Sequence, residues 1–271
     1  MTAAITRDDL PLATDPVVTA RQLSLRTKRG WVFRDVDLTL GEGETLALAG
    51  PAGSGRSMLL LTLAGRAKPT SGSLDVAGAA RRGRIRTVAS VARITGAVEL
   101  EPDLRVIDHV REVQLLSHRA LDYRHAAELV GFTADGTTFV GDLSADEATL
   151  LAVALAVTGQ PKLLVLDDAD VGATPDQQHR IWAALVGLRS AGIAVVASTV
   201  DGGIAADHGA RLLTLPVHGE FGEIAAHEPA AESVAEPTAE PTTAESTAES
   251  TTRIADPTAP IVQEDSTDAS D

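Results

Sequence analysis

The sequence has no cysteine among its 271 residues. Disulfide bridges and metal sites built from thiolates are therefore excluded, and the composition suits a reducing compartment. No stretch approaches the roughly 18 uninterrupted apolar residues of a membrane-spanning helix. The opening residues, MTAAITRDDLPLATDP, have acids and a proline where a secretory signal needs a basic end and an apolar core. We expect a cytoplasmic protein that reaches the inner face of the cell membrane only through a partner.

Lysine is also scarce, because only three of the 23 basic residues are lysines. The formal net charge is −15, and residues 217–271 carry −12 of it, since they hold thirteen acids against the single base Arg253. The preceding residues are close to neutral. The acidic balance therefore gives no information about the partners of the folded part.

Residues 235–251 repeat the units AEPT and AEST twice each, without any aromatic residue. Such a segment has too little apolar surface to offset the entropy that ordering costs, which predicts disorder. We expect a flexible leader over 1–16, one folded domain over 17–216, and a linker with a disordered acidic Ala/Glu/Pro/Thr/Ser tail over 217–271.

Hydrophobic patterning divides the folded part into strands and helices. Residues 17–27 and 31–40 alternate apolar and polar side chains, which is typical of half-buried strands. Continuous apolar runs at 45–50, 162–168 and 193–199 predict buried strands. Residues 86–92 are a further strand candidate, and RRGRIR at 81–86 is most economically a solvated hairpin. Helical patterns follow over 105–116, 120–131, 146–159 and 175–192. Buried strands that alternate with helices predict an α/β fold, with a mostly parallel sheet covered by helices on both faces.

The segment GPAGSGRS follows the first buried strand and precedes a helical run that starts at Met58. It matches the phosphate-binding pattern Gly-x4-Gly-Lys-Ser/Thr, except that Arg56 replaces the lysine. Backbone N–H groups of such a loop and the positive end of the next helix attract phosphate, and Ser57 can bind Mg²⁺. A small-residue turn without a ligand is the alternative. The predicted nucleotide-binding residues are Gly50, Pro51, Ala52, Gly53, Ser54, Gly55, Arg56 and Ser57.

A second buried strand, LLVL, ends in two carboxylates about 110 residues after the loop. We expect Asp167 to bind Mg²⁺ and Asp168 to act as the catalytic residue that orients water. Acids at the end of a strand are often merely solvated. The loop and the acids together, in this order and spacing, are much less ambiguous than either alone.

Over residues 17–216 the chain resembles the nucleotide-binding domain of ATP-binding cassette (ABC) proteins. GPAGSGRS resembles the Walker A loop, LLVLDD resembles Walker B, and LSADE at 143–147 stands where the family has its LSGGQ signature. The resemblance implies a P-loop NTPase of ABC type, with an antiparallel β subdomain and a helical subdomain inserted at about 97–160. It also implies ATP and Mg²⁺ as cofactors, and no nucleic-acid partner.

Members of this family clamp two ATP molecules between two such domains. The resemblance thus implies a homodimer, or a heterodimer with another ABC ATPase, in which Ser144 and Asp146 act on the nucleotide of the other subunit. It further implies a membrane-spanning subunit encoded separately. The signature is degenerate, because an acid at 146 is expected to repel the partner's γ-phosphate. Asp146 and Glu147 also suit the first turn of a helix, which is the other explanation for them.

The positions at which the family has its catalytic residues also depart from the family pattern. Asp168 stands where the family has a glutamate, Val200 replaces the switch histidine, and the Q-loop glutamine falls near Gly96. Trp31 is a candidate for stacking on adenine, and a core tryptophan is the alternative. Two functions are consistent with this pattern: a slow ATPase subunit that drives a membrane partner, or a degenerate module that binds ATP without hydrolysis. A P-loop kinase or GTPase is disfavoured, because the helical insertion and LSADE have no purpose there.

Overall fold

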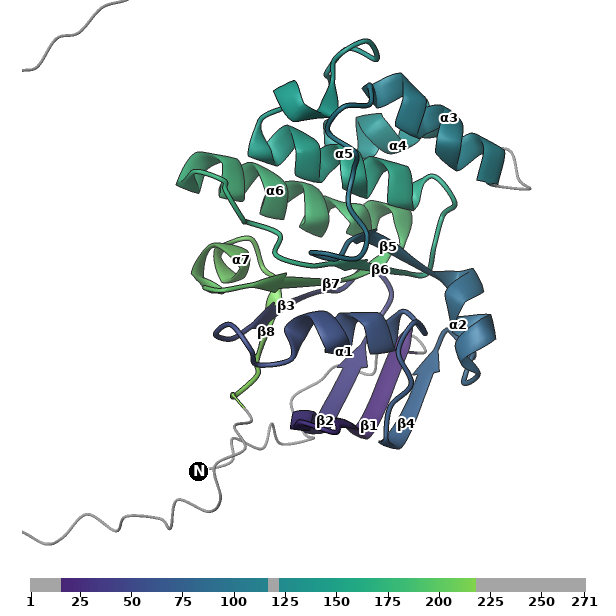
Figure 1. Ribbon diagram of the computed structural model, residues 1–271, viewed down its shortest axis with the longest axis vertical. Coiled ribbons are helices and arrows are strands. Elements are labelled where there is room, and N and C mark those ends of the chain that lie inside the picture. The colour runs from purple at the N-terminus through teal and green to yellow at the C-terminus, as the bar shows by residue number, and fades with distance from the viewer. Residues whose placement is uncertain (1–15, 117–121, 218–271) are drawn as a thin grey trace, which may run out of the picture. The chain divides into compact units, whose positions relative to one another are not determined.

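Two sheets organise the chain in the computed structural model, which describes residues 16–116 and 122–217 (Figure 1). One sheet is antiparallel with strand order β2-β1-β4, and the other is parallel with strand order β5-β6-β7-β3-β8. The leader over 1–15, part of the helix expected over 120–131, and the acidic tail beyond residue 217 lie outside the described residues.

The antiparallel sheet contains the two segments whose side chains alternate. Its strands are β1 (Val18–Thr27), β2 (Gly30–Leu40) and β4 (Ser71–Val76). Alternate side chains such as Leu38 and Leu40 are buried while their neighbours are exposed, as period-two patterning predicts. Non-glycine residues adopt positive φ at Gln22 and Asp35, where the β1–β2 pairing shifts register. These bulges bend the sheet.

The parallel sheet consists of short, almost fully buried strands. They are β3 (Thr45–Ala49), β5 (Ala89–Arg93), β6 (Leu163–Leu166), β7 (Ala194–Thr199) and β8 (Arg211–Thr214). Ala49 is in register with Thr199, and Leu166 with Ala197, so the strands end at a common edge. Ligands of such sheets bind outside the carboxyl ends of the strands. The loops that follow β3, β5, β6 and β7 therefore meet at that edge.

Helices cover both faces of the parallel sheet (Figure 1). On one face, α1 (Arg56–Leu63) and the antiparallel sheet enclose a core with side chains such as Leu48 and Val165. On the other face, α5 (Ala145–Val157) and α6 (Pro175–Gly187) enclose a second core with side chains such as Leu164. The predicted coverage of both faces is confirmed.

Most of the remaining helices lie between β5 and β6 in sequence or next to β7. Helices α3 (Val106–Leu116) and α4 (Tyr123–Val130) precede α5 and, together with it, lie between β5 and β6 in sequence. Short 3₁₀ segments occupy Val140–Asp142 and Leu188–Ala191, and α7 (Gly203–Asp207) joins β7 to β8. Within the ranges 16–116 and 122–217, no helix combines the length and apolar character needed to cross a membrane.

The segment RRGRIR is not the solvated hairpin that we expected. It forms most of helix α2 (Arg82–Val88), whose first N–H groups bond to the carbonyl of Arg81. The physical reason is Ile85, which is buried in the core around α1 while the arginines beside it stay exposed. A single buried apolar side chain is enough to hold this two-turn helix against the rest of the protein. The strand expected over 86–92 accordingly begins only at Ala89.

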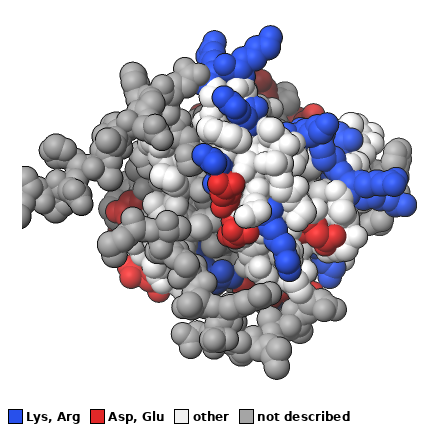
Figure 2. All heavy atoms as spheres, turned by 90° about the horizontal axis from the view of Figure 1, so that it is seen from below, with Lys and Arg blue, Asp and Glu red and all other residues white. Residues whose placement is uncertain are grey.

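Positive charge gathers on the part of the protein formed by the antiparallel sheet, α1 and α2. Residues 16–88 contain twelve Lys and Arg side chains against five acids, although the whole chain is acidic. Figure 2 views the molecule from below, and blue side chains outnumber red ones on this face. A surface with this balance attracts anions towards the glycine loop, which belongs to the same part of the chain.

Candidate nucleotide-binding site

The glycine loop, residues 50–57, connects β3 to α1 and needs glycine at Gly55. This residue has φ of 90°, and a Cβ atom there would lie 2.2 Å from the carbonyl oxygen of Val32 on β2. Any side chain at 55 would therefore collide with backbone. The loop can lie against β2 only because this position lacks a Cβ.

The loop carries a buried polar atom that no group of the described residues satisfies. Ser54 is buried, and within the described part of the chain its Oγ has no hydrogen-bond partner. Gly53 has φ of 82°, so left-handed backbone occurs at both 53 and 55. A curled glycine loop with an unsatisfied hydroxyl at the start of an eight-residue helix fits a phosphate group.

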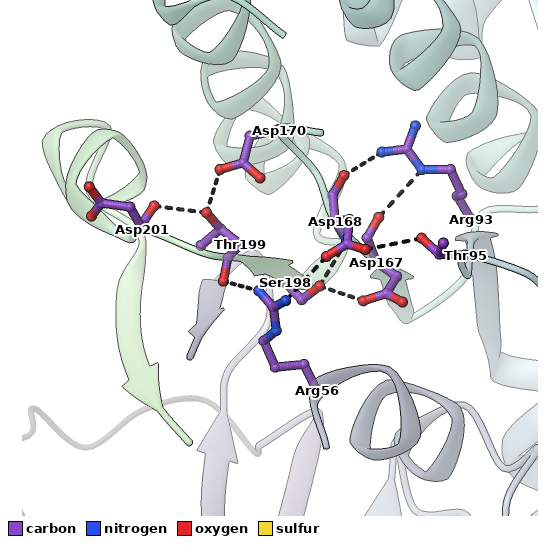
Figure 3. A network of polar contacts seen from close by, with 9 residues as sticks. All are labelled: Arg56, Arg93, Thr95, Asp167, Asp168, Asp170, Ser198, Thr199 and Asp201. Atoms are coloured by element: carbon purple, nitrogen blue, oxygen red, sulfur yellow. Dashed lines mark hydrogen bonds and ion pairs between the residues drawn. The ribbon is translucent and has the colours of Figure 1, made fainter. Parts of the chain in front are cut away.

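Asp167 follows β6 and is completely buried. Its Oδ1 accepts a hydrogen bond of 2.5 Å from Ser198 Oγ, but its Oδ2 is without a partner among the residues that the structure describes (Figure 3). An unpaired carboxylate oxygen in the interior is costly unless a cation or water completes it. The donor set thus fits the Mg²⁺ that we expected at Asp167.

Asp168 is held through both its backbone and its carboxylate. Its backbone has φ of 44°, which is uncommon for a residue other than glycine. Its N–H donates to Ser198 Oγ over 2.8 Å, and its carbonyl accepts from Arg93 Nη2 over 2.5 Å. Its carboxylate accepts from Thr95 Oγ1 over 3.1 Å and pairs with Arg56 (Figure 3). These contacts fix both the strained backbone and the direction of the carboxylate.

Arg56 leaves the glycine loop and reaches the strand ends. Its guanidinium donates to the carbonyl of Thr199 and forms an ion pair of 3.4 Å with Asp168, and only 10% of its side chain is exposed. The cation that the sequence assigns to phosphate is thus bound to the ends of β6 and β7 in this structure. Its length and planar fork allow it to contact both groups at once.

Sequence reasoning missed Arg93, Ser198 and Thr95, although all three contact the acidic pair, Asp167 and Asp168. The available signal was polarity at the end of a buried strand, since Arg93 ends β5 and Ser198 lies near the end of β7. Burial lowers the pKa of Arg93, while the nearby carboxylates raise it by a smaller amount. Thr95, rather than the neighbouring Gly96, provides the side chain from the loop after β5.

The signature segment begins helix α5, with Ser144 as its N-cap. Glu147 accepts the Ser144 N–H over 3.0 Å, and Asp146 accepts from Ser144 Oγ over 2.6 Å. Asp146 is only 3% exposed and forms an ion pair of 2.7 Å with Arg180 of α6. Its carboxylate is therefore turned into the protein and neutralised there. The repulsion of a partner's phosphate by Asp146 stays a prediction.

Burial by itself raises the pKa of Asp146. Hydrogen bonds from Ser144, the backbone and Arg180, together with the charge of Arg180, act in the opposite direction and outweigh it, so the pKa lies below its ordinary value. The carboxylate stays charged at neutral pH. Both acids of LSADE thus have the role in the first turn of a helix that was the alternative explanation for them.

The sequence singled out two further positions, Val200 and Trp31. Val200 follows β7 and is 68% exposed, and its apolar side chain offers no hydrogen-bonding group at the strand end. Trp31, on β2, precedes Val32, the residue whose carbonyl approaches Gly55. The Arg26 and Arg34 guanidinium groups each lie 5.3 Å from the Trp31 ring centroid. The indole therefore lies beside two cations, and its stacking on adenine stays a prediction.

A parallel sheet with a glycine loop after β3 and an acidic pair after β6, two strands away, defines a P-loop nucleotide-binding domain. The family model described as ABC transporter matches residues 33–171. The chain belongs to the ABC transporter family.

Curated relatives and solved structures agree with this assignment. An ABC transporter ATP-binding protein from Streptomyces avermitilis is 34% identical over 238 residues, which cover 83% of this chain and 40% of the relative. A ribose import ATP-binding protein from a Chelativorans species is 31% identical over 60% of this chain and 34% of the relative. The chain thus spans well under half the length of these relatives.

One solved structure with the same fold is a dimeric ATP-binding cassette bound to ADP and phosphate. Its TM-score is 0.61 at 20% identity, and the match covers 73% of this chain and 94% of that one. A nucleotide-free cassette from an ABC transporter gives a TM-score of 0.63 at 14% identity, over 74% of this chain and 88% of that one. The predicted fold class is confirmed for the described residues.

Proposed function

We propose that this chain is the ATP-binding subunit of an ABC-type transport complex and hydrolyses ATP slowly to drive a separate membrane-spanning subunit. The observation that carries the proposal is the buried Oδ2 of Asp167, which has no partner among residues 16–116 and 122–217. It lies at the same sheet edge as the glycine loop, whose Ser54 hydroxyl is likewise without a partner in those ranges. Both atoms need a ligand, and Mg²⁺ with a nucleotide phosphate supplies one to each.

In this proposal the glycine loop binds the phosphates of ATP, and Ser57 and Asp167 hold Mg²⁺. The metal ion, when bound, neutralises phosphate charge and aligns the γ-phosphoryl group. Asp168 orients the attacking water, for which Arg56 must first release its carboxylate. Val200 supplies no hydrogen bond to the γ-phosphate or the water. Turnover is therefore slow relative to a site with a complete set of polar groups.

Mg²⁺-dependent ATP hydrolysis by the purified chain, alone and with its membrane subunit, tests this function. We expect measurable phosphate release that falls at least about tenfold in Asp168→Asn, because the amide cannot polarise water. Asp176→Asn is the matched control, since this exposed acid lies in the first turn of α6. Hydrolysis at background level in both preparations would refute the proposal.

The partners are proposed on the basis of the relatives' descriptions, which include ribose import and Nod factor export ATP-binding proteins. A second copy of this chain or another cassette completes the clamp around ATP. The dimeric cassette structure with ADP and phosphate supports such an arrangement, and the membrane subunit determines the transported substrate.

A non-hydrolysing ATP-binding module is the second candidate, favoured by Val200 and by the Arg56–Asp168 ion pair. It predicts ATP binding without phosphate release, and loss of that binding in Ser57→Ala and Asp167→Ala. If neither substitution weakens ATP binding, the nucleotide does not occupy this site, and both candidates are rejected.

A further inference from the structure

Arg93 connects three groups that are distant in sequence. Its Nη2 donates to the carbonyl of Asp168 over 2.5 Å, its Nε donates to the carbonyl of Asp167 over 3.4 Å, and its Nη1 donates to Thr149 Oγ1 over 3.0 Å. Figure 3 shows its side chain directed at the backbone of the acidic pair from the end of β5. One guanidinium thus binds the backbone of both acids and a hydroxyl on helix α5.

This arrangement uses the shape of the guanidinium more than its charge. Among residues 16–116 and 122–217, no carboxylate lies within ion-pair distance of Arg93, and each of its partners is a carbonyl or a hydroxyl. Burial disfavours its cation, which lowers its pKa. A lysine has the same charge but a single donor atom, so it cannot contact three separated acceptors.

The Asp168 backbone depends on such contacts, because its φ of 44° is strained for a residue with a side chain. Its carbonyl accepts from Arg93 Nη2 and, over 3.2 Å, from the N–H of Val171, while Ser198 Oγ accepts its N–H. These bonds hold the backbone from which the Asp168 carboxylate projects. The bond to Thr149 extends this control to α5, since Thr149 is fully buried and donates to the carbonyl of Ala145 in the first turn.

We propose that Arg93 is a positioning residue for the acidic pair and couples it to the first turn of the signature helix α5. It does not contact nucleotide. It keeps Asp167 aimed at Mg²⁺ and Asp168 aimed at water, and it transmits displacements of either acid to the helix that begins with Ser144. The inference rests on the proposed function, because it assigns a purpose to a residue beside that site.

Steady-state kinetics of Arg93→Met and Arg93→Lys test this role. We expect kcat to fall about 10–100-fold in both variants, as when an outer partner of a catalytic group is removed, while KM for ATP changes less than about twofold. Thr149→Val removes only the link to α5 at nearly constant volume, and it should give a smaller decrease. Thermal unfolding of each variant verifies that the fold is retained.

Chemical rescue separates positioning from a merely structural role. In Arg93→Ala, guanidinium chloride at low millimolar concentration should restore part of kcat, and the same concentration of sodium chloride should not. An unchanged kcat in Arg93→Met, or equal losses in kcat and ATP affinity without rescue, would overturn the proposal.

A measurement of ATP binding tests the proposal even when turnover is too slow to follow. Wild type should bind ATP more tightly with Mg²⁺ than with EDTA, and Arg93→Met should lose most of that gain because Asp167 is no longer aimed. If wild type gains affinity from Mg²⁺ and the variant gains equally, only the role of Arg93 fails. If wild type does not bind ATP, the proposed function fails and the role of Arg93 with it.

Discussion

Asp167 and Asp168 are neighbours in sequence, yet their surroundings give them different properties. Asp167 is completely buried and keeps one oxygen without a partner in the described part of the chain, while Asp168 accepts a bond from Thr95 and pairs with Arg56. Thr95 lies in the loop after β5, and Arg56 lies at the end of the glycine loop. The different surroundings of the two acids are therefore a result of the fold.

Asp146 provides a prediction for stability at the same scale. Its pKa in the folded protein is below its ordinary value of 3.8. The ion pair with Arg180 is thus fully effective above that value, and its contribution is lost as pH falls through the folded pKa. We expect Asp146→Asn to lower the free energy of unfolding by about 1–3 kcal/mol at pH 7, and by progressively less below pH 3.8.

Urea unfolding at a series of pH values measures this difference. Asp142→Asn is the control, because this acid is exposed and nearby in sequence. A deficit for Asp146→Asn that stays constant down to pH 2 would mean that the ion pair does not stabilise the protein.

The elements show how much the sequence determines. Several elements were predictable from the sequence, because each has a local pattern of apolar, alternating or glycine residues. They are the buried strands, the half-buried β1 and β2, and the glycine loop. Helix α2 was not predictable, since four arginines around Ile85 resemble a solvated turn until the core that receives Ile85 is known. Local patterns identify elements, and tertiary contacts decide the ambiguous ones.

The same limit applies to the candidate site. The glycine loop and the acidic pair are contiguous motifs, so sequence reasoning found them. Arg93 and Thr149 are 56 residues apart and meet only through the pairing of β5 with β6 and the packing of α5 on β5. The inward direction of Asp146 likewise depends on Arg180, which lies on a helix after β6.

The junction between the glycine loop and β2 gives a prediction at the scale of elements. Gly53 and Gly55 both have positive φ, but a Cβ at 53 meets nothing within 4 Å, whereas one at 55 meets the Val32 carbonyl at 2.2 Å. Gly53→Ala should cost about 1–2 kcal/mol of stability from backbone strain alone. Gly55→Ala should cost clearly more and weaken ATP binding, because the loop must move away from β2.

Thermal unfolding and ATP titration of the two variants provide the comparison. Equal losses of stability would show that the loop accommodates a side chain at 55 and that the contact with β2 is not required.

At the scale of the whole chain, both hydrophobic cores lie within the described residues, and the contacts of residues 1–223 form one compact unit. We therefore expect a chain truncated after Glu223 to unfold within about 2 °C of the full-length protein, since no core residue is removed. It should also keep its affinity for ATP. Differential scanning calorimetry and ATP titration measure the two quantities, and a substantial fall in either would give residues 224–271 a part in the folded domain.

The chain has two tryptophans, and their different surroundings make the intrinsic fluorescence of the protein informative. Trp182 lies on α6 and is fully buried in the core, where its emission follows only the loss of the fold. Trp31 is only partly buried on β2, beside Arg26 and Arg34, so its emission reports on the surface around it. Unfolding is therefore readable from the fluorescence of the unlabelled protein, and a change on adding ATP that is absent in Trp31→Phe would show that the nucleotide reaches this strand.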